Sequence, residues 1–111
     1  MALTRVCGVG DLGPGEMAAF FVDDWEVLVV RDGDGALHAM DGICPHEDFP
    51  LVYGDLHGMV LTCANHMWSF DVTTGQGINP PTCSLARYHV EIQGEDIYVD
   101  RQSRETPSDT S

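Results

Sequence analysis

Short apolar segments recur at close intervals along this 111-residue chain, and each ends at Gly, Pro, Asp or Asn. Segments of this length, rich in β-branched and aromatic residues and bounded by turn formers, are typical of β-strands. No stretch has the length and period of a helix. The sequence therefore predicts an all-β fold. The segments are LTRVCGV, EMAAFFV, WEVLVVRD, ALHAMD, GMVLTC, WSFDV, YHVEIQ and DIYVD.

Two of the connections have the composition of hairpin turns. RDGDGAL joins the strands expected at 25–32 and 36–41, and QGED joins those expected at 88–93 and 96–100. Residues 42–58 instead show little alternation and contain two prolines, so we expect a long loop there. The segment TTGQGINPPTC is also irregular, and we expect it to fold over neighbouring loops.

A chain of this length has room for one modest core, so we expect a single domain over residues 1–101. The last residues, RQSRETPSDTS, are polar and offer no apolar anchor. We therefore expect a disordered tail over residues 102–111.

The charge balance excludes several kinds of partner. There are 18 acidic and 5 basic residues, which gives a formal net charge of −13 and makes nucleic acids and anionic membranes poor ligands. The first residues lack the apolar run of a signal peptide, and no stretch approaches the roughly 20 apolar residues of a membrane span. We expect a soluble, cytoplasmic monomer whose partners present basic surfaces.

Histidine stands beside two of the four cysteines. One residue separates Cys44 from His46, and two residues separate Cys63 from His66. Cysteines in a reducing cytosol serve as metal ligands or buried thiols more often than as structural disulfides. Two thiolates and two imidazoles could hold either Zn²⁺ or a [2Fe–2S] cluster in which histidines replace two cysteines. Zinc pairs usually group like residues, whereas here each loop supplies one of each kind, which favours a two-iron centre.

The stretches CPH and CANHMWSF resemble the Rieske [2Fe–2S] signature. The resemblance implies that Cys44 and Cys63 bind the inner iron, and that His46 and His66 bind the outer, solvent-facing iron. It also implies three stacked antiparallel sheets with a small cluster-binding subdomain. That subdomain would contain ligand loops at about 42–50 and 62–70 and a covering loop at about 75–83.

The similarity extends to HMWSF, TGQGINP, Cys83 and YHVEIQGEDIYV, which resemble Rieske ferredoxins of soluble toluene, alkene or isoprene monooxygenases. This implies an electron carrier, not an enzyme, that links a flavin-dependent NADH reductase to a diiron hydroxylase. Three alternatives stay open: a ferredoxin of a Rieske ring-hydroxylating dioxygenase, a structural zinc-binding module, and a small redox sensor.

One departure from the family pattern bears on the redox potential. Respiratory Rieske proteins have an extra cysteine in each ligand loop and a serine two residues after the second histidine. Here both loops lack the extra cysteine, and Trp68 occupies the serine position. Fewer hydrogen bonds to cluster sulfur and many nearby carboxylates both disfavour the reduced state, so we expect a low potential for this family.

The remaining candidates receive structural interpretations. We interpret Cys7 and Cys83 as buried thiols that could form a disulfide only if the fold brings them together. Glu47 and Asp48 lie beside His46 and are candidates for a docking face. Three other histidines, His38, His57 and His89, are expected to be structural or exposed. Six aromatic residues are expected to pack in the core and sheets: Phe20, Phe21, Trp25, Phe70, Tyr88 and Tyr98.

Overall fold

A computed structural model describes residues 3–44, 49–64, 68–79 and 84–105. Ten strands and two single-turn 3-10 helices make up the described elements, which confirms the all-β prediction. No helix in these ranges is long and apolar enough to cross a bilayer. The elements are β1 (Leu3–Gly8), η1 (Val9–Asp11), β2 (Met17–Val22), β3 (Trp25–Arg31), β4 (Leu37–Asp41), η2 (Leu51–Tyr53), β5 (Asp55–His57), β6 (Val60–Thr62), β7 (Ser69–Asp71), β8 (Gly77–Asn79), β9 (Arg87–Gln93) and β10 (Asp96–Glu105).

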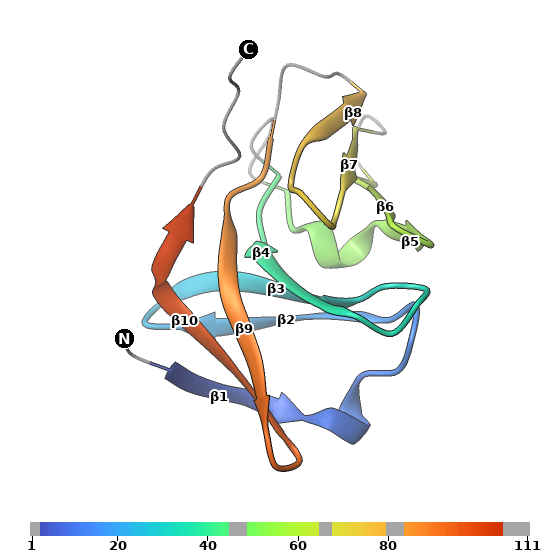
Figure 1. Ribbon diagram of the computed structural model, residues 1–111. Coiled ribbons are helices and arrows are strands. Elements are labelled where there is room, and N and C mark those ends of the chain that lie inside the picture. The colour runs from blue at the N-terminus through green and yellow to red at the C-terminus, as the bar shows by residue number, and fades with distance from the viewer. Residues whose placement is uncertain (1–2, 45–48, 65–67, 80–83, 106–111) are drawn as a thin grey trace.

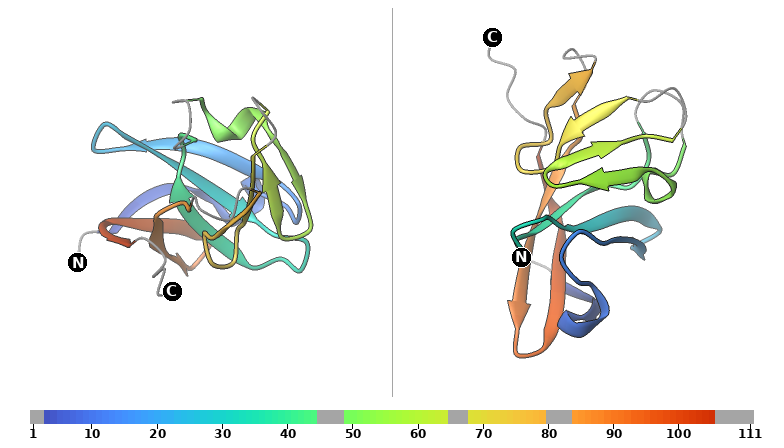
Figure 2. Two further views of the ribbon diagram at one scale, coloured as in Figure 1. Left: turned by 90° about the horizontal axis from the view of Figure 1, so that it is seen from above. Right: turned by 90° about the vertical axis from the view of Figure 1, so that its right-hand side faces the viewer.

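The strands form two antiparallel sheets. The larger sheet has the order β1-β10-β9-β4-β3-β2 and the smaller has the order β5-β6-β7-β8. Figure 1 shows the smaller sheet above the β2–β4 part of the larger one, and the second view in Figure 2 shows the same stacking from the side. The larger sheet forms the base of the molecule, and the smaller sheet lies on one side of it.

Strand β3 is buried on both faces, as its sequence WEVLVVR requires. Side chains alternate across a strand, so a run of consecutive apolar residues must meet apolar surroundings on each side. Val27 and Val29 point into the core of the base, whereas Leu28 and Val30 point into the core beneath the smaller sheet. All four are completely buried. One strand therefore joins the two halves of the molecule.

The larger sheet wraps around the core of the base. The buried residues of that core come from all six of its strands and from the segment after η1: Cys7, Leu12, Val22, Val27, Val29, Ala39, Tyr88, Ile97 and Val99. Such a cluster requires β1, β9 and β10 to face β2, β3 and β4 across it. Figure 1 shows β9 and β10 running steeply across the direction of β2 and β3.

The resemblance implied three stacked sheets, and hydrogen bonding joins two of the expected layers into one. The junction is the short ladder between β4 and β9, in which Ala39 pairs with Tyr88 and Met40 pairs with Arg87. The described residues thus form two layers in the base and the smaller sheet above them, and hydrogen bonds group these strands into two sheets.

Both predicted hairpins are confirmed, with β3 pairing with β4 and β9 with β10. The prediction of one long loop over residues 42–58 is wrong in part, because η2 and β5 lie within it. The tail predicted from residue 102 is also wrong at its start, since β10 continues to Glu105. Polar side chains fix this extension: Ser103 donates to the carbonyl of Asp100, and Arg104 binds Asp41. Residues 106–111 lie outside the described ranges.

Gly54 follows η2 at a point where the backbone passes close to β6. A Cβ atom at this position would overlap the carbonyl oxygen of Thr62 and lie 3.2 Å from that of Leu51. Both of those atoms belong to the backbone, so they cannot move aside as the end of a flexible side chain can. Glycine is therefore required here by close approach of two backbone segments.

We expect Gly54→Ala to lower the free energy of unfolding by about 1–3 kcal/mol, as overpacking of a close contact does. The matched control is Gly10→Ala, because no atom lies within 4 Å of a Cβ built at Gly10. Urea unfolding of both variants measures the difference. Equal stabilities for the two variants would contradict the close approach at Gly54.

Candidate functional site

The loop that contains the first Cys/His pair is closed by hydrogen bonds at its base. Ile43 pairs with Pro50 in an isolated antiparallel bridge, and the amide of Cys44 donates to the carbonyl of Phe49 over 2.8 Å. Outside this bond, the amide of Leu51 donates to the carbonyl of Gly42. The cysteine thus occupies the last paired position before the loop.

The loop that contains the second pair is closed in the same way. Thr62 pairs with Ser69 at the end of the β6–β7 ladder, and the amide of Cys63 donates to the carbonyl of Trp68 over 2.6 Å. Each cysteine therefore donates to the residue five positions later, at the mouth of a hairpin-like loop. The two predicted ligand loops have equivalent closures although their Cys/His spacings differ.

Both cysteines belong to one core. Cys44 is 1% exposed and Cys63 is completely buried, and they lie in the cluster between the base and the smaller sheet. The structure thus brings together the two thiol-bearing candidates, whereas His46 and His66 lie outside the described residues. Within the described ranges, no group of three or more His, Cys, Asp or Glu side chains is arranged to hold a metal ion.

Two buried sulfur donors at the mouths of equivalent loops fit a thiolate-bound iron centre. Soft thiolates are the usual ligands of iron–sulfur clusters, and burial excludes water from their side of such a centre. The rest of this cluster is apolar: Leu28, Val30, Met40, Leu51, Leu61, Phe70, Val72 and Leu85. Any further ligands must then come from the loops beyond the cysteines.

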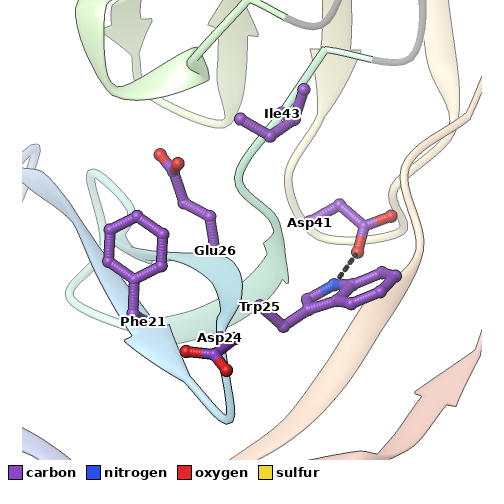
Figure 3. Close-up of a pocket in the computed structure, with 6 residues that line it drawn as sticks. All are labelled: Phe21, Asp24, Trp25, Glu26, Asp41 and Ile43. Carbon is purple, nitrogen blue, oxygen red and sulfur yellow. Dashed lines mark hydrogen bonds between the residues drawn. The ribbon is translucent and has the colours of Figure 1, made fainter.

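Asp41 anchors the base of the first loop. Its carboxylate accepts hydrogen bonds from the Tyr88 hydroxyl at 2.5 Å, from Arg104 at 2.8 and 3.2 Å, and from the Trp25 indole at 3.3 Å. Figure 3 shows the contact with Trp25. The next residue, Gly42, lets the chain lie directly against β3, because a Cβ there would meet the Cγ of Glu26 at 2.8 Å. The path from β4 to Cys44 is therefore fixed on two sides.

These contacts set the protonation of Asp41 and Tyr88. Burial disfavours the charged form of Asp41, but hydrogen bonds from Arg104, Tyr88 and Trp25 outweigh it and hold the pKa of the carboxyl below its usual value. Burial and the hydrogen bond to Asp41 raise the pKa of Tyr88. Asp41 is thus a carboxylate and Tyr88 a neutral donor throughout the neutral pH range.

The irregular segment expected to cover the loops follows β7. Asp71 caps its first turn through bonds to the amide and hydroxyl of Thr73, and Gln76 bridges to Ser84. The amide of Leu85 donates to the carbonyl of Gly75 over 2.7 Å, which draws the two ends of the segment together. Pro80, Pro81 and Cys83 lie outside the described residues, as do Pro45, Glu47 and Asp48.

The three remaining histidines behave as predicted. His38 is buried, with Nε2 at 2.8 Å from the Asp32 carboxylate and Nδ1 at 3.2 Å from Arg87. His57 and His89 are exposed, and His89 pairs with Glu91. The hydrogen bond from His38 lowers the pKa of Asp32, whose other oxygen accepts two amides of the β3–β4 turn. This network holds a hairpin together.

Cys7 also behaves as predicted. It is 7% exposed in the core of the base, and burial raises the pKa of its thiol. A raised pKa keeps the sulfur protonated and unreactive, as expected of a small buried apolar residue. Cys83, with which the sequence allowed a disulfide, lies outside the described residues.

The prediction of core packing is wrong for two of the six aromatic residues. Phe21 is 73% exposed and Trp25 is 41% exposed, whereas Phe70 and Tyr88 are buried. Phe21 and Trp25 lie near the turn between β2 and β3, where the hairpin extends beyond the core that covers Val22 and Val27. Alternation alone does not distinguish a core position from one beyond the edge of the core.

Sequence reasoning also missed Asp41 and Arg104 as residues of the site. They are 63 positions apart, so no local pattern connects them. Arg104 in particular fell within the predicted tail. The sequence signal that could have pointed to Asp41 is its position directly before Gly42 and the first Cys/His pair.

Comparison with known proteins identifies the class of this site. The sequence profile of the Rieske [2Fe-2S] domain matches residues 2–104, which is nearly the whole chain. The chain therefore belongs to the Rieske [2Fe–2S] family. Its cofactor is a Rieske-type [2Fe–2S] cluster, and its class is that of an electron carrier without catalytic activity of its own.

Individual relatives agree with this assignment. The chain is 44% identical over 95 residues to the ferredoxin component of the alkene monooxygenase system of Xanthobacter autotrophicus, covering 85% of this chain and 77% of that protein. It is 39% identical over 101 residues to the ferredoxin component of biphenyl 2,3-dioxygenase of Rhodococcus jostii, covering 90% and 94%. A solved complex of oxygenase and ferredoxin in carbazole 1,9a-dioxygenase contains a chain with a TM-score of 0.80 and 31% identity, covering 87% and 91%.

Replacement of Asp41 by asparagine tests the anchor of the first loop. Because the folded-state pKa of Asp41 is lowered, its charge stabilises the fold above the unfolded pKa of about 3.9, and this contribution is lost as the pH falls through the folded-state pKa. We expect Asp41→Asn to cost about 1–3 kcal/mol at pH 7, and the difference from wild type to shrink below about pH 4.

Urea unfolding at a series of pH values measures this difference. Asp34→Asn is the control, since Asp34 is exposed. A destabilisation by Asp41→Asn that is the same at pH 7 and pH 3 would show that its charge does not support the loop.

Proposed function

We propose that this protein carries single electrons from a flavin-dependent NADH reductase to the hydroxylase of a multicomponent diiron monooxygenase. The observation that carries the proposal is the pair of equivalently closed loops with Cys44 and Cys63 buried together at their mouths. The similarity to a ferredoxin of an alkene monooxygenase system supports this type of hydroxylase. We place the carrier in the cytoplasm as a monomer, in keeping with its acidic composition.

Four residues are proposed as ligands of the cluster, which supplies one-electron redox chemistry when bound. Cys44 and Cys63 would bind the iron on the buried side, because their thiols face the core. His46 and His66 would bind the other iron, because each follows one of these cysteines at the spacing of the Rieske signature. The imidazole side would then be the route by which electrons enter and leave.

The charge distribution suits docking at this end of the molecule. Between residues 42 and 86 the sequence has four acidic residues and no lysine or arginine. All five arginines belong to the base: Arg5, Arg31, Arg87, Arg101 and Arg104. The cluster-bearing half thus has no basic side chain to repel a partner with a basic surface, and the association rate would fall as salt screens the attraction to this acidic protein.

A ferredoxin of a ring-hydroxylating dioxygenase is the second candidate function. The relative from the biphenyl dioxygenase system and the chain in the carbazole dioxygenase complex favour it. The two candidate functions are distinguished by measuring steady-state turnover with this protein as the sole electron carrier. One assay contains the purified hydroxylase of an alkene monooxygenase, and the other contains the purified oxygenase of biphenyl dioxygenase. Turnover with the dioxygenase alone would contradict the diiron partner. The family match favours either carrier function over a zinc module or a sensor.

The ligand set is tested by single substitutions. We expect Cys44→Ser and Cys63→Ser to prevent cluster assembly, and His46→Ala and His66→Ala to abolish the Rieske spectrum. Cys7→Ser is a matched control, because Cys7 is buried in the other core and should leave the cluster intact. Optical and EPR spectra, with iron, sulfide and zinc counted on the same samples, measure the outcome. An unchanged spectrum in any of the four variants would remove that residue from the ligand set.

The redox potential is expected at the low end of the Rieske range, nearer about −150 mV than +300 mV. The amides of Cys44 and Cys63 donate to loop-closing carbonyls, so neither amide is available to stabilise negative charge on cluster sulfur. The absence of lysine and arginine between residues 42 and 86 acts in the same direction, because this segment supplies no such cation to offset the added electron. A potentiometric titration followed by EPR gives the value. A clearly positive midpoint would refute this expectation.

A further inference from the structure

A hollow lies on the flank of the base, beside the chain that leads to the first ligand loop. Its volume is about 390 Å³. Figure 3 shows its walls, which come from the end of the β2–β3 hairpin, the end of β4 and the segment after β4. The lining residues are Phe21, Asp24, Trp25, Glu26, Asp41 and Ile43.

Two of the lining residues are large aromatic side chains that face solvent. Phe21 is 73% exposed, and Trp25 is 41% exposed although the guanidinium groups of Arg101 and Arg104 lie over its ring. In Figure 3 they flank the carboxylates of Asp24 and Glu26. Exposed aromatic rings beside a hollow are more typical of binding surfaces than of ordinary protein surface.

The hollow also has excess negative charge. Asp41 is neutralised by Arg104, but the side chains of Asp24 and Glu26 make no hydrogen bond or ion pair with any residue that the structure describes. Two uncompensated carboxylates between aromatic rings favour a cationic, planar ligand over an anionic or aliphatic one.

Arg104 shows how such a ligand binds in this same region. Its guanidinium carbon lies 5.5 Å from the centroid of the Trp25 ring, while two of its nitrogens bind the Asp41 carboxylate. Stacking on an aromatic ring combined with a carboxylate pair is a geometry that guanidinium satisfies and ammonium does not. Phe21, Asp24 and Glu26 offer the same combination to an arginine from outside.

We propose that this hollow receives an arginine side chain of the hydroxylase, as a docking contact on the flank of the protein. The assignment to the hydroxylase rests on the function proposed above, and it is preferred over the reductase because a relative's fold occurs in a complex with an oxygenase. Ile43 lines the hollow and directly precedes Cys44, so a partner anchored here also faces the first ligand loop. The contact would orient the partner about the cluster.

The first test uses the peptide acetyl-Gly-Arg-Gly-amide, followed through the NMR signal of the Trp25 indole N–H. We expect a saturable shift with this peptide and none with its citrulline analogue, which has the same shape without the charge. Asp24→Asn combined with Glu26→Gln should weaken binding about fivefold, as the loss of two exposed ion pairs does. Phe21→Thr should also weaken it, because the aromatic platform is removed.

The matched control is Asp34→Asn combined with Glu95→Gln, which removes the same charge from exposed positions in two other turns. Peptide affinity should be unchanged in this control. Equal weakening in both double variants, or a Trp25 signal that does not respond, would overturn the proposal, because binding would then reflect overall charge or occur elsewhere.

The second test measures electron transfer from the pre-reduced protein to the hydroxylase in stopped flow. At limiting hydroxylase, we expect the Asp24/Glu26 double variant to transfer electrons more slowly than wild type. Its EPR spectrum should be unchanged, and the Asp34/Glu95 control variant should transfer electrons at the wild-type rate. If the Asp24/Glu26 double variant transfers electrons to the hydroxylase at the normal rate but is reduced more slowly by the reductase, the hollow does not bind the hydroxylase. If the wild-type protein transfers no electrons to the hydroxylase, the proposed function fails as well, whereas the peptide titration still decides whether the hollow binds guanidinium.

Discussion

The burial of β3 on both faces is the constraint on which the rest of the structure depends. Its four consecutive apolar residues, 27–30, supply side chains alternately to the core of the base and to the core that holds Cys44 and Cys63. A displacement of this strand would disturb both cores together, since its side chains interdigitate with each. The Asp41–Arg104 contact and the close approach of Gly42 then fix the first loop relative to the same strand. The site is thus positioned by the base and does not depend on the loops alone.

The two ligand loops present a common solution to one physical problem. The thiols of Cys44 and Cys63, the proposed buried ligands of the cluster, need rigid backbone to hold them in place. Each cysteine is placed at the last hydrogen-bonded position of a hairpin-like closure, where the chain is still constrained by pairing. The same bonds occupy the cysteine amides, so the geometry that holds the ligands also influences the electrostatics of the centre.

The sequence was sufficient for features that depend on local pattern. The apolar run in WEVLVVRD and the turn formers in RDGDGAL and QGED predicted strands and hairpins that the structure contains, and the mixed Cys/His pairs indicated the class of centre. Contacts between distant residues escaped prediction, because the partner of a side chain such as Arg104 is decided by the fold as a whole. The exposure of Phe21 and Trp25 escaped for the same reason: an apolar strand residue is buried only if another element reaches it.

The pairing of β1 with β10 brings together the two ends of the described chain. The smaller sheet, in contrast, consists of strands that are consecutive in sequence, from β5 to β8. Contacts between neighbouring segments form faster than contacts that close long loops. In a chain emerging from the ribosome, the cluster-bearing sheet can therefore pair before the base is complete. Strand β10 is the last described strand in the sequence and carries the Arg104 that binds Asp41, so this support of the first ligand loop forms only after β10 has been synthesised.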